Sequence, residues 1–387
     1  MRIVYLDNAS TTPVHPEVLE AMLPFLSPAY GNPSSIHRMG REAREAVENS
    51  RERIAALLGA DGSEIVFTSG GTEADNLAIK GTAYAMRHKG KHMITSAVEH
   101  HAVLNAFKAL EQEGFEVTYV PVDRAGMVDP ASVEKSIRSD TILISIMHAN
   151  NEVGTIQPIE QIAEIAQKKN IRLHTDAVQT FGHIPTLVDE LGVDLLSVSA
   201  HKLYGPKGVG ALYVRRTVEI SPILHGGGQE RGLRPSTENV PGIVGFAKAS
   251  EIALAGMGER EAKVTRLRDR LLRGLLTSVE SSYLNGHERL RLPGNVNLTI
   301  RYVEGESLVF ALDQHGVCVS TGSACGSREH EPSHVLRAMG LPPEDLHSSV
   351  RLSLGTQNTR AEIDYAIEAM VEVVGRLRAM SPIYRGA

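Results

Sequence analysis

Short apolar runs alternate with amphipathic stretches along the first 215 residues of the chain. An apolar run of about four to eight residues, bounded by polar turns, is typical of a buried strand. The predicted strands are 64–68, 92–97, 117–120, 141–147, 172–175, 195–198 and 211–214. Helical periodicity lies between several of them, at 74–87, 102–113 and 159–169. This alternation predicts an α/β fold with a mainly parallel sheet, covered by helices on both faces.

The pattern changes after residue 242. A long amphipathic helix is expected within 254–283, where it links the first part of the chain to the second. The elements beyond it are shorter, with strands at 295–300, 316–319 and 349–354 and a helix at 307–314. They predict a smaller α+β domain. We therefore expect a large domain of residues 15–255 and a small domain of residues 1–14 with 256–387.

Composition narrows the class of protein. The chain has 387 residues, 42% of them hydrophobic, which is enough for a large core. Its net charge of −6 gives no basic excess, so we expect no direct nucleic-acid binding. No apolar run approaches a membrane span, and the amino terminus lacks the pattern of a signal peptide. With only two cysteines, a disulfide framework is not expected, and we predict a cytoplasmic protein.

Polar groups follow one predicted strand after another. Because the carboxyl ends of parallel strands share one edge of a sheet, these groups are expected to surround a ligand there. They are Gly71, Thr72, His100, Asn151, Asp176, Gln179, Ser199, His201 and Lys202. A GxGxxG nicotinamide motif after the first strand and a Walker loop are both absent from the sequence.

Two of these groups have a simpler interpretation. Lys202 ends a strand, where partial burial can make its amine a nucleophile, but a lone lysine in that place is usually a surface residue. Gly71 and Thr72 begin a helix, whose free N–H groups suit a phosphate. The alternative for that turn is a helix that Thr72 caps with its hydroxyl.

Three further residues are candidates. Cys325 lies in a glycine- and serine-rich loop, where a thiol can be reactive, whereas Cys318 is flanked by valines and is expected to be inert. Arg351 lies within an apolar strand and needs an anion, either a substrate carboxylate or a structural carboxylate. The paired His100 and His101 lack metal-ligand spacing, so no firm metal site is predicted.

Motifs along nearly the whole chain resemble those of one enzyme family. They are YLDNASTTP, YGNPSSIHRMGR, FTSGGTEADNLAI, VEHHAV, HANNEVG, HTDAVQ, SVSAHKLYGPKGVGALYVR, GGGQERGLRPST, STGSACGSREHEPSHVLRAMG and VRLSLGTQNT. Together they resemble the class V aminotransferase group of pyridoxal-phosphate enzymes of fold type I, and most closely the group I cysteine desulfurases. The resemblance implies a seven-stranded large sheet and pyridoxal 5′-phosphate as cofactor.

The resemblance also implies roles for individual residues. Lys202 would form a Schiff base with the cofactor, Asp176 would pair with its ring nitrogen, and His100 would stack on the ring. Asn151 and Gln179 would contact the phenolic oxygen side. Gly71, Thr72, Ser199 and His201 would hold the phosphate, and Thr237 would reach the phosphate of a neighbouring subunit in a homodimer. Arg351, with Asn32, would bind the substrate carboxylate.

Cys325 would then take sulfur from L-cysteine, leaving L-alanine and an enzyme persulfide. The expected partner is an iron–sulfur scaffold protein or another sulfur acceptor, such as a tRNA-thiolating enzyme, and Cys325 could also serve as a transient iron–sulfur ligand. Two alternatives stay open. One is a selenocysteine lyase or other cysteine lyase on the same scaffold, and the other is a catalytically idle assembly scaffold. Replacing Cys325 by alanine would distinguish a desulfurase from a lyase, because desulfuration of cysteine should collapse while selenium release could survive. The presence of both Lys202 and Cys325 argues against an idle scaffold.

Overall fold

The computed structural model describes residues 3–322, 332–381 and 384. Its centre is a seven-stranded sheet in the order β2-β8-β7-β6-β5-β3-β4. The strands are β2 (Ile65–Thr68), β3 (His92–Ser96), β4 (Glu116–Val120), β5 (Thr141–Ser145), β6 (Arg172–Asp176), β7 (Leu195–Ser199) and β8 (Gly210–Val214). All neighbouring strands are parallel except β8, which runs antiparallel to both β2 and β7. The predicted α/β class and mainly parallel sheet are confirmed.

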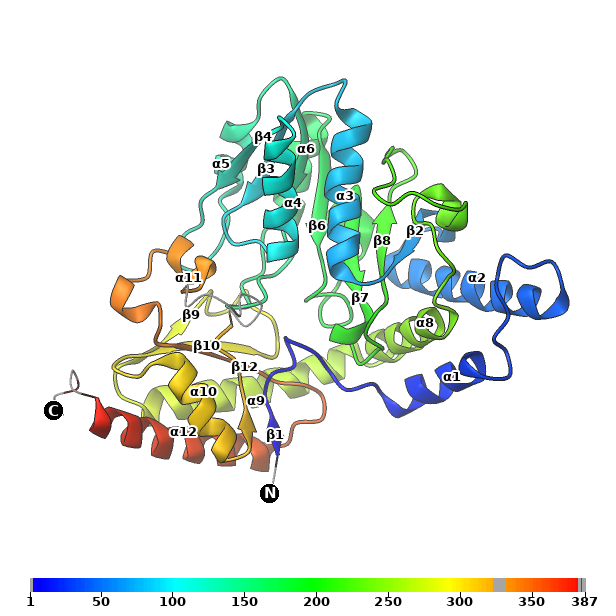
Figure 1. Ribbon diagram of the computed structural model, residues 1–387. Coiled ribbons are helices and arrows are strands. Elements are labelled where there is room, and N and C mark those ends of the chain that lie inside the picture. The colour runs from blue at the N-terminus through cyan, green and yellow to red at the C-terminus, as the bar shows by residue number, and fades with distance from the viewer. Residues whose placement is uncertain (1–2, 323–331, 382–383, 385–387) are drawn as a thin grey trace.

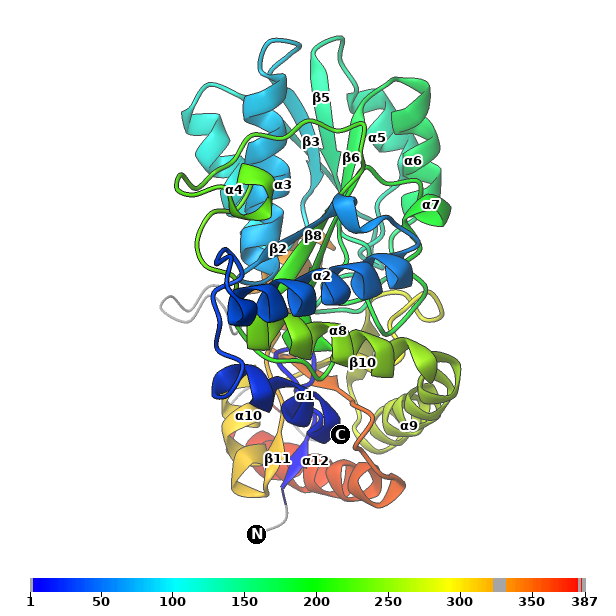
Figure 2. The same ribbon diagram turned by 90° about the vertical axis from the view of Figure 1, so that its right-hand side faces the viewer.

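Helices cover both faces of this sheet (Figures 1 and 2). On one face lie α3 (Gly71–Met86) and α4 (His101–Gln112), which pack on Val66, Met93 and Leu143. The other face carries α2 (Arg38–Leu58), α5 (Pro130–Ser136), α6 (Ile159–Lys168), α7 (Val188–Leu191) and α8 (Val240–Ala255). Side chains alternate along each strand, so Ile65 and Phe67 face one layer and Val66 the other.

A second hydrophobic core contains side chains from both the amino-terminal and the carboxyl-terminal parts of the chain. β1 (Val4–Tyr5) pairs in parallel with β11 (Val317–Cys318), and β10 (Asn295–Ile300) lies between β9 (Ser282–Asn285) and β12 (Ser349–Ser353). The helices packed in this core are α9 (Met257–Ser278), α10 (Gly305–Gln314) and α12 (Arg360–Met380), whereas α11 (His334–Ala338) packs on Val98 and Val153 in the loops after β3 and β5. Val4 and Leu6 share a buried cluster with side chains of β10, β12 and α12. The division into domains at residue 255 stays a prediction.

Two elements of the carboxyl-terminal part are absent from the predicted set, β9 and the 21-residue α12. The signal for α12 was present in the sequence. Thr359 and Glu362 form a capping box at its start, and Ile363, Ala366, Met370 and Val373 recur at helical spacing on its buried face.

Among the described residues, no single helix is long and apolar enough to cross a membrane. The pair α8 and α9, bent by 74° at their junction, reaches the required length and composition only when taken together.

Candidate active site

Most of the predicted site residues lie where the strands of the large sheet end. Asp176 is the last residue of β6, and Lys202 follows β7 directly in the short 3-10 helix η2 (Ala200–Lys202). His100 follows β3 as the N-cap of α4, and Asn151 follows β5. These strands are parallel neighbours, so their carboxyl ends share one edge. The edge therefore holds a lysine, a carboxyl and an imidazole within one neighbourhood.

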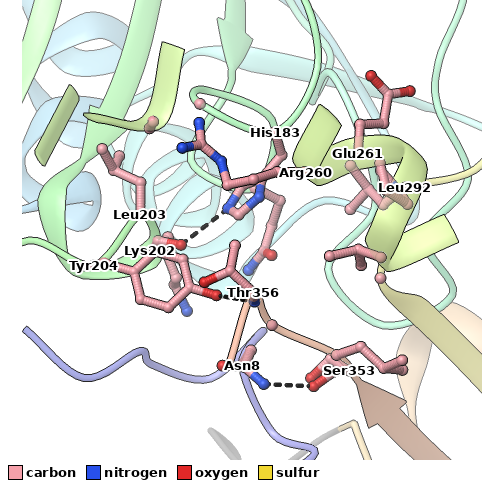
Figure 3. Close-up of a pocket in the computed structure, with 18 of the residues that line it drawn as sticks. Asn8, His183, Lys202, Leu203, Tyr204, Arg260, Glu261, Leu292, Ser353 and Thr356 are labelled. Atoms are coloured by element: carbon pink, nitrogen blue, oxygen red, sulfur yellow. Dashed lines mark hydrogen bonds between the residues drawn. The ribbon is translucent and has the colours of Figure 1, made fainter. Parts of the chain in front are cut away.

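Lys202 is half-buried and held from two sides. Its Nζ donates to the carbonyl oxygens of Ala9 (2.6 Å) and Ser10 (2.8 Å), and its own carbonyl accepts from His183 Nε2 (2.9 Å). A cavity of about 150 Å³ lies beside it, lined also by Gln179, and Figure 3 shows the contact between His183 and Lys202 at its wall. Lys202 thus differs from the solvent-exposed lysine that the simpler interpretation expected.

Asp176 is a buried carboxyl at the carboxyl end of β6. It is 6% exposed, and its Oδ1 accepts from the backbone N–H of Val178 (2.8 Å). Burial raises the pKa of this carboxyl, and the positive charge of Lys202 opposes that shift only in part. A protonated ring nitrogen would supply a further positive charge. The donor chemistry at Asp176 therefore fits the pyridinium nitrogen of pyridoxal phosphate.

His100 is held as a neutral imidazole. Its Nδ1 accepts from the backbone N–H of Ala102 (3.2 Å), so the ring proton is assigned to Nε2. Burial and, to a smaller extent, the nearby charge of Lys202 lower the pKa of His100 to about 4. At neutral pH a flat, uncharged ring with one N–H donor lies at the sheet edge.

The start of α3 is an open anion site. Its N-cap is Gly70, at φ 153°, and no side chain in the described part of the protein caps this end. The interpretation with Thr72 as the capping residue is therefore wrong, and the first N–H groups of the helix stay available. At Gly71 a Cβ would lie 2.7 Å from Val178 Cγ2, so only glycine lets this turn approach the segment after Asp176. The cradle fits a phosphate next to a ring that Asp176 contacts.

His201 and Ser199 lie at the same end of β7. His201 Nδ1 contacts Thr11 Oγ1 at 3.2 Å, and burial lowers the pKa of His201 to about 4. Ser199 is buried at the end of the strand. Gln179 Nε2 donates to the carbonyl of Ala9 (3.0 Å), which also accepts from Lys202. Three loops, from β6, from β7 and from the amino terminus, therefore converge on Lys202.

Arg351 belongs to β12, and its guanidinium contacts the loop after β5 at this edge. Its Nη1 donates to the carbonyl of Asn151 (2.9 Å), and its Nη2 donates to Asp7 Oδ1 (3.0 Å) and Ser10 Oγ (2.7 Å). The structural ion pair that was one alternative is thus present, with Asp7. Arg351 Nε is nevertheless buried without a hydrogen-bond partner among the described residues. This N–H lacks a partner but is closed off from solvent, so binding of a substrate carboxylate by Arg351 stays a prediction.

Two predicted site residues, Asn32 and Thr237, are not brought to this edge, and a third is not among the described residues. Asn32 is exposed, and its Oδ1 accepts from Ser34 N in its own loop (2.9 Å). Thr237 is also exposed, as a residue that serves a neighbouring subunit would be. Cys325 lies outside the described residues. Cys318 is partly buried in β11, and burial together with Asp313 and Asp7 raises the pKa of its thiol.

Sequence reasoning missed two buried acids beneath Asp176. Glu99 accepts hydrogen bonds from Ser96 Oγ (2.5 Å) and from Met147 N (3.0 Å), and burial raises its pKa to about 8. Asp75, in α3, is also fully buried, and burial together with the charge of Asp176 raises its pKa well above the ordinary value. The sequence did carry a signal for them. Asp75 lies in the same motif as Thr72, FTSGGTEADNLAI, and Glu99 directly precedes His100 in VEHHAV. Both are expected to be neutral, which leaves the negative charge to Asp176.

A buried ion pair anchors the loop that carries Thr237. Arg51 Nη1 and Nη2 donate to the two carboxylate oxygens of Glu230 (2.7 Å each), and Glu230 Oε2 also accepts from Phe67 N (2.7 Å). The side chains are 5% and 3% exposed. Further along the same loop, Arg234 pairs with Glu73 in the first turn of α3 (2.8 Å). The loop is thereby tied to β2 and to the candidate phosphate cradle.

We expect Glu230→Gln to lower the free energy of unfolding by about 2–3 kcal/mol, because the buried Arg51 guanidinium then keeps only the half-exposed Glu48 as its anion (3.1 Å). The matched control is Arg53→Gln, whose partner Glu251 lies 3.4 Å away in an exposed pair. That change should cost less than about 1 kcal/mol. Urea unfolding of both variants measures the difference, and equal losses would contradict a buried anchor.

Comparisons with known proteins agree with this geometry. The sequence profile described as aminotransferase class-V matches residues 4–366. The chain is 56% identical to the cysteine desulfurase IscS of Dictyoglomus turgidum, covering 98% of this chain and 97% of that protein. It is also 56% identical to the cysteine desulfurase IscS of Methanosarcina thermophila, covering 99% and 94%.

Solved structures are similar as well. A NifS-like protein superposes with a TM-score of 0.92 at 43% identity, over 97% of this chain and 100% of the other. The apo cysteine desulfurase of Thermococcus onnurineus superposes with a TM-score of 0.87 at 26% identity, over 97% and 95%. Enzymes of this family use pyridoxal 5′-phosphate, whose ring nitrogen and phosphate the groups around Asp176 and Gly71 fit. The chain therefore belongs to the class-V aminotransferase family and, within it, to the cysteine desulfurases.

Proposed function

We propose that the protein converts L-cysteine to L-alanine with pyridoxal 5′-phosphate and transfers the sulfur to Cys325 as a persulfide. The observation that carries this proposal is the meeting of Lys202, Asp176 and His100 at one sheet edge, in a chain 56% identical to proteins named cysteine desulfurase. The sulfur would supply iron–sulfur cluster assembly, and tRNA thiolation is a further use. A selenocysteine lyase is the less favoured alternative, because each relative named above as a curated protein is a cysteine desulfurase.

Each residue has a defined task in this proposal. Lys202 would hold the cofactor covalently and, once substrate displaces it, move the proton at the substrate Cα. Asp176 would pair with the ring nitrogen, and the N–H groups after Gly70 would hold the phosphate. The free Nε of Arg351 would bind the substrate carboxylate. When bound, the cofactor supplies an electron sink for the bonds at Cα.

Sulfur transfer would then depend on Cys325. Its thiolate would attack the substrate sulfur, so that an S–S bond forms while the C–S bond breaks and its electron pair stays on carbon. The carbon takes up a proton and becomes the methyl group of alanine. The balance is one cysteine and one enzyme thiol to one alanine and one enzyme persulfide, without an external oxidant.

The assembly around this chain is part of the same proposal. We infer a homodimer in which the exposed Thr237 of each subunit reaches the phosphate site of the other. We further propose that the enzyme acts in the cytoplasm, and that residues 15–255 form the cofactor-binding domain and residues 1–14 with 256–387 the small domain. The sulfur acceptor would be an iron–sulfur scaffold protein, as the name IscS of the relatives suggests.

The function is tested by incubating the purified enzyme with L-cysteine. We expect alanine and sulfide equivalents in equal amounts, and mass spectrometry should locate the persulfide on the peptide that contains Cys325. Persulfide on Cys318 in place of Cys325, or no alanine, would overturn the proposal.

The role of Asp176 has a test of its own. Without cofactor, Asp176→Asn is expected to be roughly 1–2 kcal/mol more stable than the wild type at pH 8, because the folded-state pKa of Asp176 is raised and ionising the buried carboxyl costs stability. The difference should shrink as the pH falls through the raised folded-state pKa of about 6, to roughly a third of its pH 8 value at pH 4.5, because the carboxyl is protonated in both states only below its ordinary pKa.

With cofactor the order should reverse, since only the ionised carboxylate pairs with the ring nitrogen, and activity should fall roughly 100-fold. Thermal unfolding of both forms at pH 4.5 and pH 8 measures these effects. The exposed Asp313→Asn is the control. A stability difference independent of both pH and cofactor would count against the assignment.

A further inference from the structure

Glu152 is a buried acid that the proposed chemistry does not use. It lies in the loop after β5, directly after Asn151, and is 3% exposed. Burial raises the pKa of its carboxyl, and the hydrogen bond from Ser333 and the charges of Arg351 and His101 oppose that shift. A buried acid in such a place is costly unless its contacts are used.

The carboxyl of Glu152 binds one segment that is distant in sequence and lies beside another. Its Oε2 accepts from Ser333 Oγ (2.5 Å), and Ser333 is the N-cap of α11. The same oxygen faces Gly322, where a Cβ would lie 3.3 Å from it. Gly322 has φ 92°, a conformation that favours glycine, and its N–H donates to Ser320 Oγ (3.1 Å). One carboxyl therefore lies between Gly322 and Ser333.

The backbone of Glu152 is fixed independently of that carboxyl. Its carbonyl accepts from the side-chain amides of Asn295 and Asn297 of β10 (3.1 Å each). Its N–H donates to Asn150 Oδ1 (2.9 Å). The preceding residue, Asn151, is a predicted cofactor contact and accepts from Arg351 through its carbonyl. The loop that positions the cofactor and substrate groups thus also presents Glu152.

Residues 323–331, which contain Cys325, follow Gly322 and precede Pro332. Ser333 comes directly after Pro332. We propose that Glu152 is a positioning residue for sulfur transfer: its carboxyl binds Ser333 on one flank of the Cys325 segment, lies beside Gly322 on the other, and so holds these flanks against the loop that carries Asn151. This inference rests on the proposed function, because it assigns Glu152 to the step in which Cys325 receives sulfur. It acts through Gly322 and Ser333 and does not touch the reacting atoms.

The test separates sulfur transfer from proton transfer in the same holoenzyme. Exchange of the Cα hydrogen of L-alanine with solvent deuterium reports the chemistry at Lys202 without Cys325. Single-turnover persulfide formation on Cys325 from L-cysteine reports the transfer. We expect Glu152→Ala to slow persulfide formation roughly 10- to 100-fold while the exchange rate changes less than about twofold, since loss of position by about 1 Å has effects of this size.

Three further variants sharpen the result. Glu152→Gln keeps an oxygen that accepts from Ser333 and should form persulfide within about threefold of the wild-type rate. Ser333→Ala removes the hydrogen bond to Glu152 and the cap that Ser333 Oγ provides to Leu336 N of α11 (3.2 Å), with no change of residue in the loop after β5, and should slow persulfide formation about three- to tenfold. The exposed Glu160→Ala of α6 should change neither rate.

A selective loss of persulfide formation supports the proposal. Equal losses of both rates, or no loss in Glu152→Ala and Ser333→Ala, would overturn it. If Glu152→Ala does not fold, the persulfide rates of Ser333→Ala and Glu152→Gln test the proposal instead: it requires a loss in the first and a nearly unchanged rate in the second. A wild-type enzyme that exchanges alanine but forms no persulfide refutes the proposed function instead, so the two failures are distinguishable.

Discussion

Replacing Lys202 with alanine is expected to lower alanine formation from L-cysteine by roughly a thousandfold or more, because one amine would both hold the cofactor and move the substrate proton. In the structure Nζ is fixed by the carbonyls of Ala9 and Ser10, and its charge acts on both His100 and Asp176. No other lysine follows a strand at this edge in the described residues. The measurement is steady-state alanine release with excess pyridoxal phosphate.

A second readout reports the lysine itself. Borohydride traps the covalent link between a cofactor aldehyde and a lysine, so peptide mapping of the reduced wild-type enzyme should find the adduct on Lys202. The matched control is Lys207→Ala, which removes an exposed lysine five residues away and should leave activity within about twofold. An adduct on another lysine, or a Lys202→Ala enzyme within tenfold of the wild type, would contradict the assignment.

Cys325→Ala is expected to abolish persulfide and to lower desulfuration of L-cysteine by roughly a thousandfold, because alanine offers no nucleophile for sulfur. Exchange of the Cα hydrogen of alanine should continue at nearly the wild-type rate, since that step needs Lys202 and not the thiol. The measurements are single-turnover persulfide mapping and deuterium exchange on the same preparation.

Cys318→Ala is the matched control. Burial and the carboxylates of Asp313 and Asp7 raise the pKa of the Cys318 thiol, so little thiolate is present at neutral pH. Its loss should leave sulfur transfer within about twofold. Selenium release from selenocysteine that survives Cys325→Ala at the full wild-type rate, together with poor wild-type activity on cysteine, would favour the lyase alternative.

Much of the fold was predictable because its signals are local. The buried strands of the large sheet are short apolar runs, and polar residues begin where each strand ends, as at Asp176 and Lys202. Helix starts with clear caps were equally accessible, and α12 was missed although Thr359 and Glu362 mark it. The turn at Gly70 misled local reasoning, because Thr72 has the right chemistry for a cap but lies inside the helix.

Contacts between distant segments were not predictable from one sequence. Arg351 meets Asp7 and Ser10 only because β12 lies beside the amino-terminal segment, with Asp7 bridged to Ser353. The bidentate pair of Arg51 with Glu230 joins residues 179 positions apart. The apolar strand around Arg351 indicated that it needs an anion but not which one, and nothing in the local pattern distinguishes Arg51 and Glu230 from an exposed arginine and glutamate.

The sequence by itself determined the order of strands and helices, the edge at which Lys202, Asp176 and His100 meet, and the family to which these motifs are similar, because each of these follows from neighbouring residues. Tertiary structure alone decided the electrostatic state of that edge. Burial of His100, Asp75 and Glu99 makes them neutral, and burial of Asp176 leaves a carboxyl that requires a cation. Only folding brings Glu152 between Gly322 and Ser333, because desolvation and long-range contacts arise when separate segments pack together.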